Sequence, residues 1–320
     1  MKNSNTITLA QAIDGFLLDC AARRLSVHTI SDYTNSLRKL AAYLTTDPPL
    51  TAITADQVRG FLASLANRPA DQHPIGKKQA RNIHTGLSAL WTWALANRYA
   101  TEHILHSIER PKAEQRVISP LTQEEVVRLL AACDRRTATY SRPGKRECSN
   151  ARPTRLRDHA IILLLLDTGL RASELCDLQI RHADLKNRRI LAYGKGDKER
   201  LLPVSASTAK ALWQYCQAER KEAPVNAALF VGLGEVPLTR SGLGQILAAL
   251  GATADVPDVH PHRFRHTFAV AFLRNGGNAY ELQQALGHTT LEMTRVYLDL
   301  ASSDLVAAHK RASPVEHWRL

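Results

Sequence analysis

Helical periodicity runs through roughly the first third of the chain and then stops at a basic segment that contains two prolines. Between Ile108 and Pro120 the apolar residues lose their regular spacing, and arginine and lysine side chains stand beside the prolines. Because proline lacks a backbone N–H and ends helices, such a segment is typical of an exposed linker. We therefore predict two domains, residues 1–112 and 119–320, joined by a linker at residues 113–118. A length of 320 residues, large for one hydrophobic core, agrees with this division.

The region before the linker is predicted to be a bundle of amphipathic helices. In Leu9–Tyr99 the apolar residues return every three to four positions, which is the period of a helix with one buried face. Thr54, with Gln57 three residues later, is typical of a capping box that begins one of these helices. Trp91 lies on an apolar stripe and is expected in the core, whereas Trp93 fits either core packing or base stacking.

The region after the linker is predicted to be mainly helical with a small antiparallel β-sheet. A second capping box, Thr122–Glu125, begins its first helix. The period changes at Arg189–Tyr193 and Glu199–Val204, two β-compatible runs that flank Gly194–Asp197 as in a hairpin. From Thr208 onward the pattern is again mainly helical, with one proline-containing break.

The balance of charge favours a polyanionic partner. Lysine and arginine number 42 against 30 acidic residues, a net charge of +12, and nucleic acid is the first candidate. No long uncharged apolar stretch is present and Met1–Asn5 does not begin a signal sequence, so we expect a cytoplasmic protein without membrane contact. The five cysteines form no C-x-x-C pair, which favours buried thiols. Arg135–Arg157, rich in arginine, is either a solvated loop or a contact to the phosphate backbone.

Residues that can do chemistry stand at the ends of the predicted helices and at the hairpin turn. Arg171 follows a glycine break at the start of a helix, and Lys195 lies at the glycine-flanked tip of the hairpin. His262 and Arg265 are three positions apart at the beginning of another helix, so they can project from the same face.

Nearer the C-terminus, His288 follows a Leu-Gly pair, and a third capping box, Thr289–Glu292, begins a helix that places Tyr297 on its third turn. The order of these residues resembles the signature of the tyrosine recombinases, also called phage-type integrases: Arg, Lys, His-x-x-Arg, His and Tyr. The matching stretches are Thr168–Leu175, Gly194–Arg200, His262–His266, Leu286–His288 and Tyr297. The resemblance extends over nearly the whole chain, because this family, which includes Xer-like and mobile-element recombinases, has a helical core-binding domain ahead of its catalytic domain.

The resemblance implies a site-specific DNA recombinase of integrase or transposase type, in which Tyr297 attacks a DNA phosphodiester and forms a 3′-phosphotyrosyl link. Charge then grows on the nonbridging oxygens, and the planar guanidinium groups of Arg171 and Arg265 fit those oxygens with paired donors. Arg171 also stands at a helix start, where free backbone N–H groups favour an anion. Because two arginines can replace a metal ion and the covalent link stores the broken bond, we expect no metal, no ATP and no other cofactor.

Other residues receive roles from the same resemblance. Lys195 is expected to protonate the departing 5′ oxygen, His262 to accept the tyrosine proton, and His288 to hydrogen-bond the phosphate. Glu174 is expected either to support the neighbouring arginine or to be an ordinary surface acid. His266 is expected to make a structural hydrogen bond.

Any one of these residues alone has an ordinary interpretation, such as a surface arginine, a turn lysine or a packed tyrosine, but their shared order and spacing favour the functional one. The expected partner is double-stranded DNA held between the two domains and bound by a homotetramer on two recombination sites, with or without accessory proteins. Two alternatives stay open: a type IB topoisomerase, which relaxes DNA without a partner site, and a noncatalytic DNA-binding protein of the same fold. Integration, excision, dimer resolution and transposition are equally open.

Overall fold

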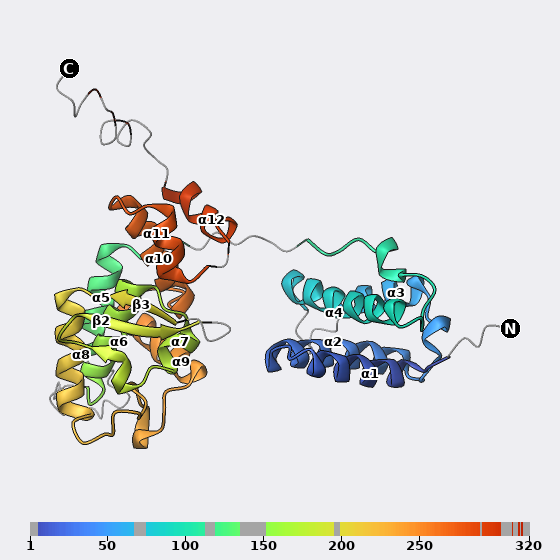
Figure 1. Ribbon diagram of the computed structural model, residues 1–320, viewed down its shortest axis with the longest axis horizontal. Coiled ribbons are helices and arrows are strands. Elements are labelled where there is room, and N and C mark those ends of the chain that lie inside the picture. Colours follow the sequence, from blue (N-terminus) through green and yellow to red (C-terminus); the bar gives the residue numbers. More distant parts are fainter. Residues whose placement is uncertain are drawn as a thin grey trace, which may run out of the picture. The chain divides into compact units, whose positions relative to one another are not determined.

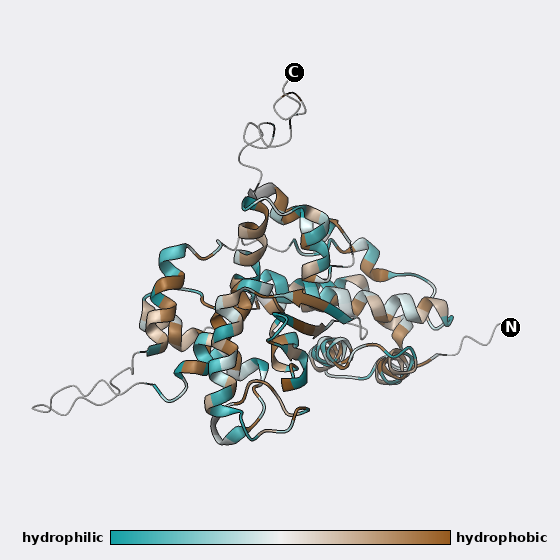
Figure 2. Ribbon diagram, turned by 60° about the vertical axis from the view of Figure 1, so that its left-hand side comes forward, coloured by the Kyte–Doolittle hydropathy of each residue, from teal (hydrophilic) through white to brown (hydrophobic). Residues whose placement is uncertain are grey.

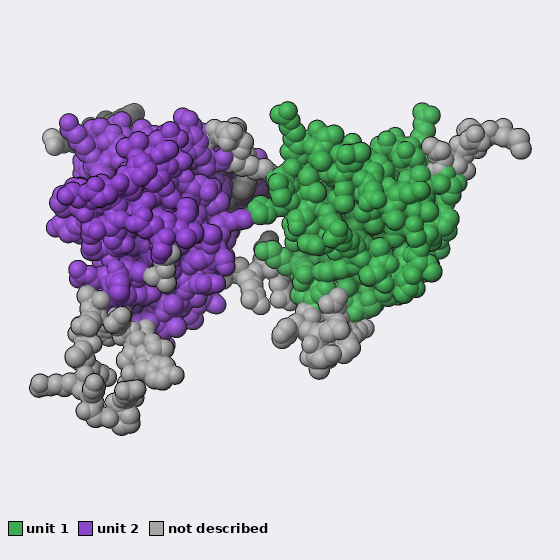
Figure 3. Space-filling model, turned by 90° about the horizontal axis from the view of Figure 1, so that it is seen from below, with its two compact units in different colours: residues 1–116 green, residues 117–320 purple. Residues whose placement is uncertain are grey.

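The protein consists of two compact units, Met1–Arg116 and Val117–Leu320, each with its own hydrophobic core (Figure 3). The computed structural model describes residues 6–66, 75–112, 119–134, 152–194, 199–288 and 290–301, together with residues 309, 313 and 315. These residues form helices and a three-stranded antiparallel sheet, which confirms the predicted fold class (Figure 1). The predicted roles of the two units, DNA binding by the first and catalysis by the second, stay predictions. No helix in the described ranges is long and apolar enough to cross a membrane.

Unit 1, the residues before Val117, is a helical bundle, as predicted. Its elements are α1 (Leu9–Ala22), α2 (Val27–Leu44), α3 (Ala55–Ala66) and α4 (Lys77–Ala96), with the short turns η1 (Leu50–Ala52) and η2 (Ile104–Ser107). Each helix carries apolar and polar residues on different faces, visible as brown and teal in Figure 2. Trp91 is buried, and Trp93 packs against Phe16 and Tyr99, so both tryptophans belong to the core.

Side-chain caps are present at the starts of helices α1 and α3 in unit 1. Thr54 and Gln57 exchange hydrogen bonds across the first turn of α3, as predicted. Gln57 Oε1 accepts from the Thr54 backbone N–H at 2.9 Å, and Thr54 Oγ1 accepts from the Gln57 N–H at 3.3 Å. Thr8 and Gln11 form a similar capping box at the start of α1, which we did not predict. These bonds satisfy backbone donors that a helix start otherwise leaves open.

Unit 2, the residues from Val117 onward, is built around the apolar helix α6 (Arg155–Thr168), which packs against helices α5, α8 and α10. Its other helices are α5 (Gln123–Asp134), α7 (Ala172–Cys176), α8 (Ala206–Glu219), α9 (Arg240–Ala254), α10 (Pro261–Arg274), α11 (Ala279–Leu286) and α12 (Glu292–Ala301), with the short turns η3 (Ile180–His182) and η4 (Leu233–Glu235). The capping box at Thr122 and Glu125 is present at the start of α5, as predicted. Helices α10, α11 and α12 contact one another at one end of the unit (Figure 1).

The sheet has the order β1-β2-β3, from β1 (Ala183–Asp184), β2 (Arg189–Tyr193) and β3 (Glu199–Pro203). The hairpin of β2 and β3 is confirmed, with Ile190 opposite Leu202 and both side chains buried. β1 was not predicted, because two residues are too short for a periodic signal. The hairpin tip at residues 195–198, and Lys195 with it, lies outside the described residues.

The chain after Thr208 is mainly helical, as predicted, and α8 ends at Glu219 before α9 begins at Arg240. One expectation about a helix in unit 2 was wrong. Helix α12 begins at Glu292, so Tyr297 lies on its second turn, not its third. The predicted cap, Thr289, lies outside the described residues.

The described part of the arginine-rich segment pairs with acids inside unit 2. Arg157 is buried, and its Nε and Nη2 donate to Asp158 Oδ1 at 2.9 and 2.7 Å. Arg152 also forms an ion pair with Asp158, and Arg155 forms one with Asp134, both at 3.5 Å. The prediction of a phosphate contact is therefore wrong for Arg157, because its guanidinium is enclosed and already bonded. Residues 135–151 lie outside the described residues.

The described cysteines are free thiols. Cys20, Cys133 and Cys176 are buried, as predicted, and Cys216 is half-buried. Burial raises the pKa of the Cys133 thiol to about 12 and that of Cys176 to about 11, so both stay protonated. Cys148 lies outside the described residues.

Candidate active site

Arg265 is the most enclosed of the candidate residues. It lies in the first turns of α10, which His260 caps and Pro261 begins, and its side chain is 2% exposed. Its Nη1 donates to the carbonyl oxygen of Gly169 and its Nη2 to that of Leu286, both at 2.8 Å. Burial, followed by the nearby charge of Arg171, lowers the pKa of Arg265 to about 10, so it remains a cation at neutral pH.

The two carbonyls that hold Arg265 belong to helix ends. Gly169 is the left-handed C-cap of α6, with φ of 60°, and Leu286 is the last residue of α11, before the left-handed Gly287 with φ of 62°. Carbonyls at a helix C-terminus lack partners within the helix and carry partial negative charge. Two such ends therefore meet the guanidinium of Arg265 and fix its position.

Glu174 accepts hydrogen bonds from two further arginines. Its side chain is buried and accepts from Arg171 Nη1 at 2.7 Å and from Arg200 Nη1 and Nη2 at 2.9 and 2.7 Å. Burial alone raises the pKa of Glu174, but the hydrogen bonds from Arg200 and Arg171 outweigh it and leave the pKa below its usual range. Glu174 is therefore ionised and supports Arg171, which confirms one of the two roles expected for it. We call Arg171, Glu174, Arg200 and Arg265 the charged cluster.

Arg171 differs from Arg265 in being partly open to solvent. Its side chain is 34% exposed, and its Nη2 donates to the carbonyl of Gly287 at 3.3 Å. At this helix start the Arg171 backbone N–H donates to Glu174 Oε2 at 2.8 Å, so this one of the backbone donors expected to favour an anion is already bonded. Helix α7, which follows, is five residues long.

His288 is a neutral imidazole beside the charged cluster. Burial, then the charges of Arg265, Arg171 and Arg200, lowers its pKa to about 4. Its Nδ1 lies 2.9 Å from Thr294 Oγ1. Its ring is nearly parallel to that of Tyr297, with an interplanar angle of 10° and centroids 6.1 Å apart.

Tyr297 is 8% exposed and packs with α10 and α11 side chains in a small apolar cluster. The ring of His266 lies 5.1 Å from it, centroid to centroid, and the electrostatic influence of Tyr297 on Arg265 places both in one neighbourhood. His266 is buried and its Nε2 has no partner in the described part of the chain, so the hydrogen bond expected for His266 is not made by that atom.

The structure thus brings together Arg171, Arg265, His288 and Tyr297, from α7, α10, the turn after α11, and α12. His262 lies in the first turn of α10 with an exposed side chain. It is close enough to His266 that its charge adds to the effect of burial in lowering the pKa of His266. Arg200 and Thr294 are parts of the site to which we assigned no role from the sequence. Arg200 stood within the matching hairpin stretch, whereas no sequence pattern pointed to Thr294.

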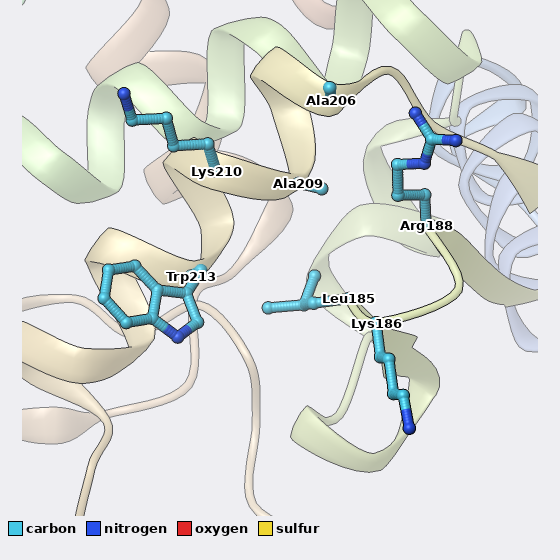
Figure 4. A pocket seen from close by; sticks show the side chains of 7 residues that line it. All are labelled: Leu185, Lys186, Arg188, Ala206, Ala209, Lys210 and Trp213. Atoms are coloured by element: carbon cyan, nitrogen blue, oxygen red, sulfur yellow. The ribbon is translucent and has the colours of Figure 1, made fainter.

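A surface hollow of unit 2 lies elsewhere. It measures about 500 Å³ and is lined by Leu185, Lys186, Arg188, Ala206, Ala209, Lys210 and Trp213 (Figure 4). None of the candidate residues lines it, and so it is not part of the candidate active site. No group of three or more potential metal-ligating side chains occurs in the described ranges.

Comparisons with known proteins agree on the kind of protein this chain is similar to. The model of the Phage integrase family matches residues 119–304, and that of the Phage integrase, N-terminal SAM-like domain matches residues 13–91. Tyrosine recombinase XerC of Alcanivorax borkumensis is 31% identical, over 98% of this chain and 96% of that protein. Tyrosine recombinase XerC of Mycobacterium tuberculosis is 30% identical, over 90% of this chain and 93% of that protein.

Solved structures show the same fold at lower identity. The Tn1549 transposon integrase in complex with a circular intermediate DNA has a TM-score of 0.74 at 18% identity, over 98% of this chain and 100% of that chain. A lambda integrase dimer bound to a COC′ core site has a TM-score of 0.69 at 18% identity, over 94% and 80% of the two chains. XerH recombinase bound to a palindromic difH substrate, in a post-cleavage complex, has a TM-score of 0.67 at 20% identity, over 93% and 82%.

Proposed function

Because the chain belongs to the phage integrase family of tyrosine recombinases, we propose that it cuts and rejoins DNA at specific sites through a 3′-phosphotyrosyl link to Tyr297. The observation that carries this proposal is the arrangement of Arg171 and Arg265 beside Tyr297 and His288, in which Arg171 comes from a distant part of the sequence. Attack by the Tyr297 oxygen on phosphorus forms the new P–O bond as the bond to the 5′ oxygen breaks. Religation reverses these steps with a second 5′ hydroxyl.

The two arginines stabilise the phosphate in this reaction. The pentacoordinate transition state carries more charge on its nonbridging oxygens than the ground state does, and guanidinium donors already held in place need no reorganisation. Arg265 is fixed by two helix-end carbonyls and Arg171 by Glu174. Removing one such donor typically costs about 2.7–4 kcal/mol of transition-state stabilisation. The mechanism therefore needs no metal ion to neutralise the phosphate, and because the broken bond is kept as a phosphotyrosine, it needs no ATP.

Proton transfer is assigned to residues at the edge of the site. A phenol with a pKa of about 10 is a weak nucleophile until its proton is accepted. His262, on the first turn of the helix that holds Arg265, is the proposed acceptor. Lys195, in the hairpin turn, is the proposed donor to the departing 5′ oxygen. His288 donates a hydrogen bond to a phosphate oxygen.

The partner that we propose is double-stranded DNA, held by residues 1–112 as the core-binding domain and by residues 119–320 as the catalytic domain, in a cytoplasmic homotetramer. The excess of Lys and Arg supports a polyanionic partner. Similar folds occur in the integrases and recombinase described above with DNA bound. Whether the natural reaction is mobile-element integration or dimer resolution depends on base contacts that the DNA site will define.

A suicide substrate tests the chemistry. We would incubate the full chain, without divalent metal, on nicked duplexes that carry the sequences flanking its gene, and separate protein–DNA adducts under denaturing conditions. Wild type is expected to form an adduct and Tyr297→Phe none, because phenylalanine keeps the packing but has no oxygen. Tyr193→Phe, at an exposed strand position, is the matched control and should retain the adduct.

The rival functions give other outcomes in the same experiment. An adduct in Tyr297→Phe would place the nucleophile on another residue. Relaxation of a supercoiled plasmid that lacks these sites would favour a type IB topoisomerase. DNA binding by wild type without any adduct would favour a noncatalytic DNA-binding protein.

A further inference from the structure

Thr294 is a buried polar residue one turn ahead of Tyr297 in α12. Its side chain is fully buried, and its Oγ1 lies 2.9 Å from His288 Nδ1. Its backbone N–H donates to the Leu291 carbonyl at 2.8 Å, so its place in the first turn of the helix is fixed. Within the described ranges no other hydrogen bond of this hydroxyl is found. Nothing in the reaction proposed above uses it.

The direction of this hydrogen bond decides which nitrogen of His288 carries the proton. Arginine charges from three elements surround the imidazole and disfavour a cation, so the ring has one N–H. If Nδ1 donated to Thr294, the threonine proton would be buried without an acceptor in the described part of the chain, which is costly. The favourable arrangement has the Thr294 hydroxyl donating to Nδ1, and this leaves the proton on Nε2.

The backbone of His288 is held as firmly as its ring. Its N–H donates to the Gln283 carbonyl at 3.1 Å, and its carbonyl accepts from Gln283 Nε2 at 3.3 Å. The ring lies nearly parallel to Tyr297. Thr294 is thus the contact that sets both the ring angle and the tautomer on a backbone that is already fixed.

We propose that Thr294 is a positioning residue, which holds His288 as its Nε2–H tautomer so that Nε2 can donate a hydrogen bond to the phosphate under attack. The inference rests on the proposed function for the identity of the acceptor. The tautomer itself is a property of the free protein. A hydrogen-bond partner on one imidazole nitrogen commonly fixes the role of the other.

The tautomer is measured first, by long-range proton–nitrogen NMR on the full chain labelled with ¹⁵N-histidine at neutral pH. His288→Gln identifies the signals of His288 by their loss. Wild type should show His288 protonated at Nε2, Thr294→Ser should match it, and Thr294→Val should show a mixture of the two tautomers. A wild-type proton on Nδ1, or a Thr294→Val spectrum equal to that of wild type, would overturn the proposal.

The second measurement is the single-turnover rate of adduct formation at saturating DNA. Thr294→Val should lower this rate about 10-fold, a loss typical for a partner that orients a functional histidine, with DNA affinity unchanged and Thr294→Ser close to wild type. Thr168→Val is the matched control, because Thr168 is similarly buried and its hydroxyl donates to the Leu164 carbonyl of its own helix, with no second bond among the described residues. An equal loss in this control, or no loss in Thr294→Val, would contradict the proposal. Absence of an adduct in wild type would instead overturn the recombination chemistry, and the NMR result alone would then decide the tautomer.

Discussion

Unit 1 and the charged cluster of unit 2 are held together by different interactions. The core of unit 1 is apolar, and its helices α1, α2 and α3 begin at capping side chains only three residues from the groups they bond. In the charged cluster, buried ions connect positions far apart in the sequence: Arg265 reaches Gly169, and Arg200 reaches both Glu174 and Ala285. Losing one such cap in unit 1 typically costs only about 1 kcal/mol. The charged cluster is costly to build and fails when one charge is removed.

Glu174→Gln gives the strongest test of this difference. The amide cannot neutralise Arg171 and Arg200, so the largely buried Arg200 is left without an anion, and unit 2 should lose about 3–5 kcal/mol of unfolding free energy. Denaturation followed by hydrogen exchange and mass spectrometry resolves the two units. Glu222→Gln, an exposed acid, should change neither unit. Equal stability of Glu174→Gln and wild type would mean that the ion pairs contribute little.

The two arginines that we propose bind the phosphate allow a comparison between an enclosed and a partly exposed residue of the candidate site. Arg171→Ala and Arg265→Ala should each lower the rate of adduct formation by about 10²–10³-fold, because each removes a transition-state donor. Arg265→Ala should destabilise unit 2 more than Arg171→Ala does, since Arg265 is 2% exposed and its loss leaves two helix-end carbonyls unpaired. Single-turnover cleavage and denaturation curves separate these effects. Equal stability losses in both variants would show that the difference in burial has no energetic consequence.

Acid should weaken unit 2 partly through its histidines. The folded pKa of His288 is about 4 against an ordinary 6.5, so the unfolded chain binds more protons between these values and stability falls as the pH drops from 6.5 to 4. Below about 4.5 the lowered pKa of Glu174 adds to the loss, since its contribution is present above the unfolded pKa. His288→Gln should reduce the slope of the unfolding free energy of unit 2 against pH. Burial also lowers the pKa of His84 in unit 1, so the pH dependence of the unfolding free energy of unit 1 should persist in the variant.

The sequence predicted the local features of the fold better than the long-range contacts of the charged cluster. Periodicity and caps indicated the bundle of unit 1 and the start of α5, because these signals are local. The sequence could not decide whether Glu174 supports the neighbouring arginine or is an ordinary surface acid, since its hydrogen bonds include those from Arg200 on a distant strand. The contact of Thr294 with His288 spans the turn between α11 and α12 and has no periodic signal. The residue types of the site were therefore predictable from their order, but the interactions that hold them were not.

A helix cap gives the smallest effect and the control for all the others. Thr54→Ala removes the hydroxyl that accepts from the Gln57 N–H at the start of α3, and should cost unit 1 about 1 kcal/mol. Thr54→Ser keeps the acceptor and should stay near wild type. Because the bond is local, the stability of unit 2 and the rate of adduct formation at saturating DNA should be unchanged. A loss of unit 2 stability in Thr54→Ala would show that the two units do not respond independently. The contrast between the local caps of unit 1 and the charged cluster of unit 2 would then have to be abandoned.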